Sequence, residues 1–374
     1  MHSRPYNLPR FSAALICCVW SLCATATSAQ DLNLPRLPQV ATPSDTFTLS
    51  KPIAITDTNK NTQLLVGMEN GQLRLSFPNM PGAEAIVPID GDEFIISAQV
   101  PAGYNRLLNE YQLGNLGTFI TGLQETAEPL AGFLMIPPEN TNFHSIFIRY
   151  YEAIVTAGRL EDAAKLTNRM PWGQLPQEYI ALSERLVYRS IEDREFQQTQ
   201  KLLSLLFQSL TEESFAGIAF RVADTLRAEG NHELAAMVYG SLALSEDSIL
   251  RQKSLLWAGY SRAVSKDADG ARNILNQVQV LERSDENFLT YCLALGRLGY
   301  AEDNISDGLR HLSRAMVLTA VDATFKPELY YLLSVGYWES GNRIAADRLA
   351  KEFSIFYPEN PWLKKYQADY ANTL

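Results

Sequence analysis

Three glycines, each followed by a pair of alanines, recur between residue 158 and the C-terminal region. They are Gly158, Gly230 and Gly341, with the pairs Ala163-Ala164, Ala235-Ala236 and Ala345-Ala346. Between them the same rhythm of two apolar-striped helices continues without the glycine at Asp193, Lys266 and Asp303, giving a period of about 36 residues. A period of that size predicts a helical solenoid, whose concave face usually binds other proteins.

The last period resembles the tetratricopeptide repeat. This family's unit has two antiparallel helices with small residues where they cross and a closing proline. The residues that carry the resemblance are Leu333, Ser334, Tyr337, Gly341, Asn342, Ala346, Ala350 and Pro358. The preceding units match less completely, and the one near 178–206 has Gln197 and Gln200 where the family has alanines. The resemblance covers residues 143–374 and implies about six repeat units.

The region before the repeats has a different pattern of apolar residues. Residues 46–100 contain short runs rich in valine, isoleucine and phenylalanine, broken by turn signals such as Asn70-Gly71. They predict a meander of four or five strands, in which Ala83–Ile89 and Glu93–Ala98 pair next to each other. We expect an extended linker at 30–45 and a degenerate helical cap at 101–142. The predicted fold is therefore mainly α, a superhelical repeat solenoid preceded by a small antiparallel β module.

The first 29 residues have the features of an export signal. Arg4 and Arg10 precede an apolar stretch from Phe11 to Cys23, and small residues lead up to a cleavage site after Ala29. The apolar stretch is shorter than a membrane span needs, so a retained anchor is the weaker alternative. We therefore expect an exported protein, periplasmic or extracellular, for which association with the cell envelope stays open, with no stable membrane span once the signal is removed.

The net charge and the cysteine content limit what the protein can bind and how its fold is stabilised. The net charge is −10, and removal of the signal would also remove two arginines. Such an acidic chain is not suited to binding nucleic acid. Cys292 is the only cysteine after residue 29, which excludes a disulfide within the mature chain. It lies in an apolar stripe, so we expect it to be buried.

The motifs of common enzyme sites do not occur in the sequence. It lacks a dinucleotide-binding glycine motif, a phosphate-binding Gly-Lys-Ser/Thr loop and a nucleophile elbow. His232-Glu233 begins a metalloprotease-like motif, but Ala236 stands in place of the second histidine. We interpret this segment as a repeat turn and the start of a helix. The sequence thus predicts a protein that is not an enzyme and holds no cofactor or metal.

Helical spacing applied to the first helix of each unit nominates a concave binding groove. The candidates are Ile148, Glu152, Glu184, Tyr188, Phe220, Asp224, Arg227, Leu256, Tyr260, Arg297, Tyr300, Tyr331 and Trp338. Aromatic and arginine side chains often carry binding energy at interfaces, although any of these could instead pack between units. Members of the tetratricopeptide repeat family that bind the acidic C-terminal tails of chaperones use Lys, Asn and Arg at these positions. Here the positions are largely aromatic or acidic, which favours an apolar or basic-plus-apolar peptide.

Three function classes follow from these features. The first is an exported scaffold or adaptor that binds a protein or peptide segment in the cell envelope through its concave face. The second is a structural subunit of an envelope or secretion complex, which a large apolar patch on the convex face would favour. The third is a cell-wall or carbohydrate-binding β module, for which the predicted strands offer only Phe77 and Phe94 as aromatic contacts.

Overall fold

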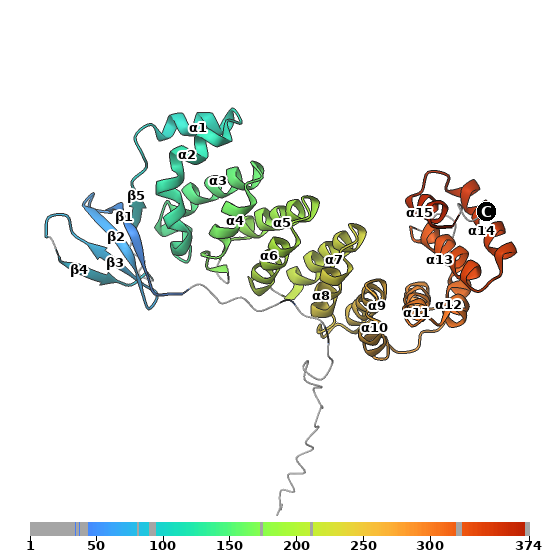
Figure 1. Cartoon of the computed structure of the whole chain (residues 1–374). Coiled ribbons are helices and arrows are strands. Elements are labelled where there is room, and N and C mark those ends of the chain that lie inside the picture. The colour runs from blue at the N-terminus through green and yellow to red at the C-terminus, as the bar shows by residue number, and fades with distance from the viewer. Residues whose placement is uncertain are drawn as a thin grey trace, which may run out of the picture.

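The computed structural model describes residues 34, 37, 44–80, 82–89, 95–172, 175–209, 212–318 and 324–370. A small sheet is followed by a curved array of paired helices (Figure 1). This confirms the predicted fold class. Residues 1–29, including the expected cleavage site after Ala29, lie outside the described residues. Within the expected linker, Leu34 is buried in the hydrophobic core, so that segment is packed at this point.

The sheet contains five strands in the spatial order β4-β3-β2-β1-β5. The strands are β1 (Phe47–Asp57), β2 (Thr62–Glu69), β3 (Gln72–Ser76), β4 (Glu84–Val87) and β5 (Ile96–Ala98). Asn70 and Gly71 join β2 to β3 with φ values of 51° and 74°. Positive φ at both central residues is the backbone geometry that a two-residue hairpin favours, as the Asn-Gly pair predicted.

β5 does not continue the meander as expected. It lies beside β1, at the opposite edge of the sheet from β4. The Asn142 side chain explains this position because it accepts a bond from the Ala98 amide at 2.8 Å and donates to the Ala98 carbonyl at 3.0 Å. The helical region therefore holds β5 at this edge by satisfying its outer backbone groups.

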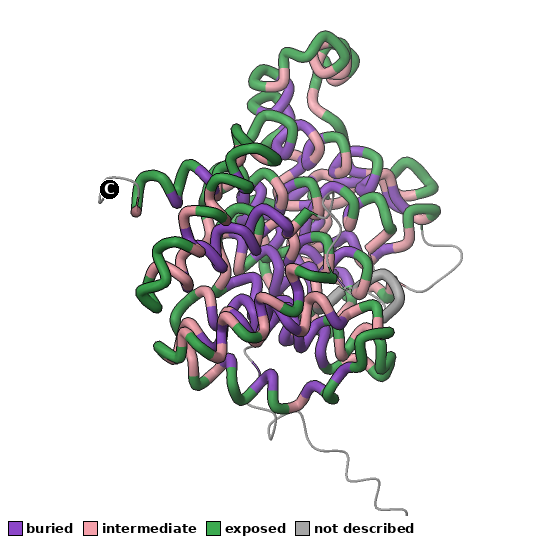
Figure 2. The backbone as a smooth tube through the Cα atoms, turned by 90° about the vertical axis from the view of Figure 1, so that its right-hand side faces the viewer, coloured by how far each residue is buried: buried purple, intermediate pink, exposed green. Residues whose placement is uncertain are grey.

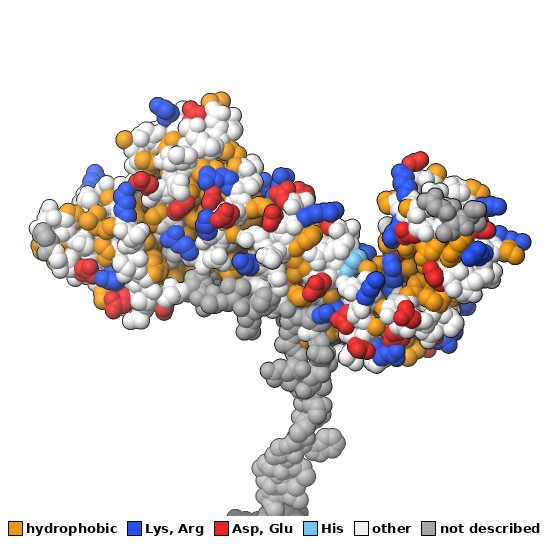
Figure 3. All heavy atoms as spheres, in the orientation of Figure 1, with side chains coloured by type: hydrophobic (Ala, Val, Ile, Leu, Met, Phe, Trp, Pro, Cys, Tyr) orange, Lys and Arg blue, Asp and Glu red, His pale blue; other side chains and the backbone are white. Residues whose placement is uncertain are grey.

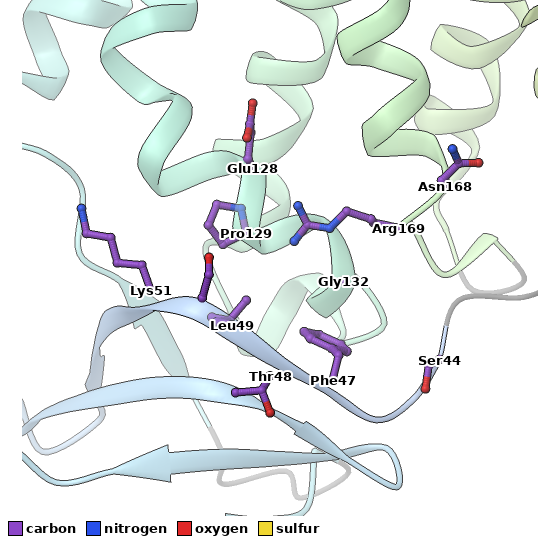
Figure 4. A pocket seen from close by; sticks show the side chains of 11 residues that line it. Ser44, Phe47, Thr48, Leu49, Lys51, Glu128, Pro129, Gly132, Asn168 and Arg169 are labelled. Carbon is purple, nitrogen blue, oxygen red and sulfur yellow. The ribbon is translucent and has the colours of Figure 1, made fainter.

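Phe47 docks the sheet onto the helices (Figure 4). Its ring lies 5.0 Å from that of Phe133, in the 3₁₀ helix η1 (Glu128–Phe133). A Cβ on Gly132 would lie 2.7 Å from the tip of the Phe47 ring, so this approach requires glycine. A groove of about 500 Å³ runs beside this contact, with Arg169 on its helical side.

The helices form seven antiparallel hairpins in the described part of the chain, followed by α15 (Pro361–Tyr370). A second 3₁₀ helix, η2 (Pro138–Asn140), precedes the second hairpin. The hairpins are α1 (Tyr104–Gln112) with α2 (Leu116–Ala127), α3 (Phe143–Thr156) with α4 (Leu160–Thr167), α5 (Gln177–Glu192) with α6 (Phe196–Ser209), α7 (Glu212–Ala228) with α8 (His232–Leu242), α9 (Ser248–Val264) with α10 (Ala268–Leu275), α11 (Phe288–Ala301) with α12 (Ile305–Leu318), and α13 (Lys326–Glu339) with α14 (Arg343–Phe356). Buried positions concentrate between the stacked helices and exposed ones lie at the rim (Figure 2).

The same three-residue turn joins the two helices of every hairpin. Its middle residue has positive φ, and its last residue donates a backbone bond to the carbonyl five positions earlier, which is the Schellman pattern of a helix end. The middle residues are Gly114, Gly158, Arg194, Gly230, Lys266, Asp303 and Gly341. The turns predicted from the glycines and from Lys266 and Asp303 are thus confirmed, and the one placed at Asp193 centres on Arg194.

Gly114 shows that the expected helical cap contains a complete hairpin, α1–α2, with the turn used by the later units. The sequence suggested only helical pieces there. The reason is at the crossing, where the large Phe119 occupies a place that small side chains take in other hairpins. Phe119 packs 5.0 Å from the Tyr111 ring, so this hairpin replaces a close crossing by an aromatic contact.

The fourth residue after each turn is buried where the two helices cross. In the last six hairpins it is small: Ala163, Thr199, Ala235, Ala271, Gly308 and Ala346. Expecting small residues at Gln197 and Gln200 was therefore wrong. The residue at the crossing is Thr199, whose hydroxyl lies 2.9 Å from that of Ser190. At Gly308 the constraint is strongest, because a Cβ on Gly299 would lie 2.6 Å from the Gly308 nitrogen.

Replacing Lys266 by glycine is expected to stabilise the protein. Lys266 is exposed and has a φ of 63°, which strains any residue with a Cβ. Relief of that strain, less the extra freedom of glycine in the unfolded chain, should raise the unfolding free energy by about 0.5–1 kcal/mol. Urea unfolding followed by helical circular dichroism measures this. Lys266→Ala is the control, because it removes the same side chain and keeps the Cβ. An equal gain in both variants would contradict the strain argument.

Candidate functional site

A hollow of about 600 Å³ lies on the inner side of the array, between α7 and α9 on one side and α13 and α15 on the other. Figure 3 shows the molecule hollowed between these two walls. Aromatic and charged side chains predominate in its lining, which consists of Phe220, Asp224, Arg227, Ala228, Gly230, His232, Lys253, Trp257, Tyr260, Thr324, Phe325, Glu328 and Trp362.

Glu328 is the centre of a buried polar network at the floor of the hollow. One of its carboxylate oxygens accepts a bond from the Tyr260 hydroxyl at 2.6 Å and two from the Arg297 guanidinium at 3.0 and 2.6 Å. Burial alone would lower the pKa of Arg297, but the adjacent Tyr260 and Glu328 outweigh it and the pKa is raised. Arg297 therefore carries its charge next to the Glu328 carboxylate, and one oxygen of that carboxylate takes all three bonds.

Arg227 belongs to a second network, on the α7 wall. Its guanidinium donates to Asp224 at 3.3 Å, and the Tyr239 hydroxyl donates to the same oxygen at 2.5 Å. The guanidinium carbon lies 4.1 Å from the centre of the Trp257 ring, a cation–π distance. The Arg227 side chain is 26% exposed, so part of this cation faces the hollow.

Lys253 adds a cation without a carboxylate partner among the described residues. Its ammonium lies 4.5 Å from the centre of the Phe220 ring, and the residue is exposed. With Arg227 and Arg297 the walls and floor carry three cations, against the two carboxylates of Asp224 and Glu328. In a chain of net charge −10 this hollow is locally positive.

His232 begins α8 at the edge of the hollow. Burial, assisted by the Arg297 and Arg227 cations, lowers its pKa to about 4, although Glu328 acts in the opposite direction. Its Nδ1 atom is buried and has no hydrogen-bond partner among the described residues. The imidazole is therefore neutral at pH 7. The predicted repeat turn and helix start at His232-Glu233 are confirmed.

The structure brings some of the nominated groove residues together. Phe220, Asp224, Arg227 and Tyr260 line the hollow, and Arg297 supports its floor. Tyr260 is only 2% exposed, so its main role is in the network described above. These residues come from helices that are adjacent in the array, as the helical spacing predicted.

Other nominated residues are packed inside the protein. Leu256 is fully buried, and Tyr331 is buried with its ring centre 5.0 Å from that of Trp362. The Tyr300 hydroxyl donates to the Leu332 carbonyl at 2.7 Å, so Tyr300 joins α11 to α13. Leu256 and Tyr331 cannot contact a partner in this conformation, and their positions fit the alternative interpretation of packing between units.

The remaining nominated residues lie outside the hollow. On α3, Ile148 is half-buried and Glu152 accepts a bond from the Tyr111 hydroxyl. On α5, Glu184 accepts from Tyr188 at 3.3 Å and from Arg221 at 2.8 Å. At the other end of the array, Trp338 lines a separate groove of about 340 Å³ with Tyr366 and Tyr370.

Helical spacing in the sequence did not identify all the residues that line the hollow. On α9 it selected Leu256 and Tyr260, whereas Lys253, Trp257 and Tyr260 line the cavity. The lining residues of α9 begin three positions earlier than a step of about 36 residues from Phe220 would place them, and Tyr260 among them bonds to Glu328 of α13. A signal for this wall exists in the sequence, because these three residues repeat the spacing of Phe220, Asp224 and Arg227. The other lining residues that helical spacing missed are Ala228, Gly230, His232, Thr324, Phe325, Glu328 and Trp362.

Cys292 is 1% exposed, as the sequence predicted, and burial raises the pKa of its thiol. A buried, protonated thiol is unreactive. In the part of the chain that the structure describes, no helix is long and apolar enough to cross a membrane.

Fold and hollow together define the class of protein, a helical-repeat solenoid with a small antiparallel sheet at its N-terminal side. No protein-family model matches this chain. A comparison with curated proteins likewise gives no match.

Acid is expected to destabilise the fold through His232. Its folded pKa of about 4 is below the unfolded value near 6.5, so the unfolded chain takes up the proton first. The stability that the neutral imidazole allows is present above pH 6.5 and is lost as the pH falls toward 4. The full loss is about 3 kcal/mol, since a pKa difference of one corresponds to about 1.4 kcal/mol.

His232→Gln tests this, because glutamine does not titrate. Urea midpoints measured from pH 7.5 to 4 should fall less steeply for the variant than for the natural protein, whatever the offset at pH 7.5. Parallel pH profiles for the two proteins would show that His232 does not contribute.

Proposed function

We propose that this protein is a non-enzymatic scaffold or adaptor, with repeats of the tetratricopeptide type, that binds a segment of a partner protein in the hollow. The observation that carries the proposal is the concave surface built by α7, α9, α13 and α15, which combines aromatic rings with cations. A volume of about 600 Å³ is in the range of binding cavities, and repeat solenoids use such inner surfaces for recognition.

The lining residues suit binding to a protein segment. Trp362, Phe220 and Phe325 are half-buried and provide large rigid surfaces, and Arg227 adds a polar group beside them. Trp257 is 9% exposed and lies under the Arg227 guanidinium. These residue types contribute most of the binding energy at protein interfaces, because they bury much area at a small entropic cost. Their convergence from four helices also explains why no short sequence motif marks the site.

The two alternative functions have less support. On α14, Ile344 and Ile355 are 70% and 74% exposed, but the exposed Arg348 and Lys351 lie between them along the same helix. The outer surface of α14 therefore lacks the continuous apolar patch that a structural subunit would favour. In the β module, Phe77 is partly buried, and Phe94 lies outside the described residues.

Binding in the hollow is tested by replacing its rim residues. Phe220→Ala combined with Lys253→Ala should strongly reduce the amount of partner that co-purifies from envelope extracts, because both side chains line the hollow and neither is fully buried. Quantitative mass spectrometry of the captured proteins measures this. The matched control is Phe356→Ala with Lys201→Ala, which removes the same residue types at exposed positions outside the hollow. Equal loss in both double variants, or in neither, would refute the proposed binding surface.

We also propose that the chain is exported to the periplasm or the extracellular space. The support is the sequence of residues 1–29 together with the burial of the one cysteine that follows them. Fractionation of cells that express the full chain should place it outside the cytoplasm, and N-terminal sequencing should give Gln30 as the first residue. A full-length product in the cytoplasm would overturn this proposal.

A further inference from the structure

We propose that the segment bound in the hollow is acidic, with an aspartate or glutamate side chain that contacts Lys253 and Arg227 beside an aromatic or large aliphatic side chain that contacts the half-buried Phe220. This inference rests on the proposed function and specifies the chemistry of its partner. It replaces the apolar or basic-plus-apolar peptide that the sequence favoured.

Four of the five aromatic rings that line the hollow have a cation of the protein over them. Arg227 lies 4.1 Å from the centre of the Trp257 ring, Lys253 lies 4.5 Å from that of Phe220, and Arg297 lies 5.5 Å from that of Trp362. Basic partners would be attracted by the electron-rich faces of free rings. Here they would instead meet the cations of the protein itself. A lysine or arginine on the partner is therefore repelled at the place where the sequence pattern suggested it would bind.

The carboxylates of the hollow offset this repulsion only in part, because both are already bonded to groups of the protein. Glu328 is 5% exposed and bonded to Arg297 and Tyr260. The Asp224 side chain is 43% exposed, and one of its oxygens is bonded to Arg227 and Tyr239. Lys253 is the cation without a carboxylate among the described residues, and it lies at the exposed rim. An incoming carboxylate would complete this charge balance, which makes an acidic partner the complementary one.

The open shape of the hollow favours a side-chain carboxylate over the terminal one of a peptide. The walls formed by α7 and α9 and by α13 and α15 face each other across a gap that is open to solvent (Figure 3). A segment can therefore pass through the hollow and need not end in it. This geometry agrees with the absence of the Lys, Asn and Arg set that some tetratricopeptide repeat proteins use to bind chaperone C-termini.

The test uses a library of random twelve-residue peptides displayed on phage, with each peptide followed by the coat protein and thus without a free C-terminus. Selection on the full mature chain should enrich peptides that contain Asp or Glu close to Trp, Phe or Leu. A selected peptide, synthesised with an amidated C-terminus, is then titrated by fluorescence anisotropy. Lys253→Glu should weaken its binding at least about tenfold, because it reverses the unpaired charge. Lys201→Glu, the same change at an exposed site on α6, should leave binding within about twofold.

The outcomes separate this inference from the proposed function. Enrichment of neutral or basic peptides whose binding is lost in Phe220→Ala would overturn the acidic partner and leave the binding surface intact. If no selected peptide depends on Phe220 or Lys253, both proposals fail. Equal weakening by Lys253→Glu and Lys201→Glu would reduce the effect to net charge and would also overturn the inference.

Discussion

The close crossing of two helices, found in the last six of the seven described hairpins, is the constraint on which the array depends. Three-residue turns reverse the chain, and their middle residue must take positive φ. At the fourth residue after the turn, a small buried side chain lets the two backbones approach. Ala235 takes this place after the turn centred on Gly230. Because turn and crossing are separated by a fixed number of residues, the loop sets the register of packing. The stacking of hairpins, and hence the inner surface, follows from that register.

The turns and the crossing residues could be predicted from the sequence, because each depends on local backbone geometry. Gly230 and Ala235 could be recognised because glycine takes positive φ without strain and alanine allows close approach of two helices. Gln197 and Gln200 misled because Thr199, a residue that is not obviously small, makes the crossing in that hairpin. The place of β5 was not predictable, since it depends on the side chain of Asn142, which is far away in the sequence. Local rules gave the units, and distant contacts placed the sheet's last strand.

For the candidate site the same division holds. Helical spacing correctly found Phe220, Asp224 and Arg227, which lie where the array is regular. It failed on α9, because a period assumes that every unit has the same neighbours. Contact of α13 with Tyr260 breaks that equivalence. The charge around the rings was not predictable either, since no sequence pattern reveals that cations lie over the rings of Trp257 and Phe220. The lining of the site therefore depends on which helices contact each other as well as on which residues they carry.

The Tyr260–Glu328 bond has a consequence for how the array comes apart. In most solenoids each repeat is coupled only to its immediate neighbours, so the ends can fray independently. This bond joins α9 to α13 and passes over the hairpin between them, α11–α12, whose Arg297 takes part in it. Three hairpins are therefore coupled as one unit. The C-terminal half should open as a single cooperative block, and the hollow should keep its shape until that block unfolds.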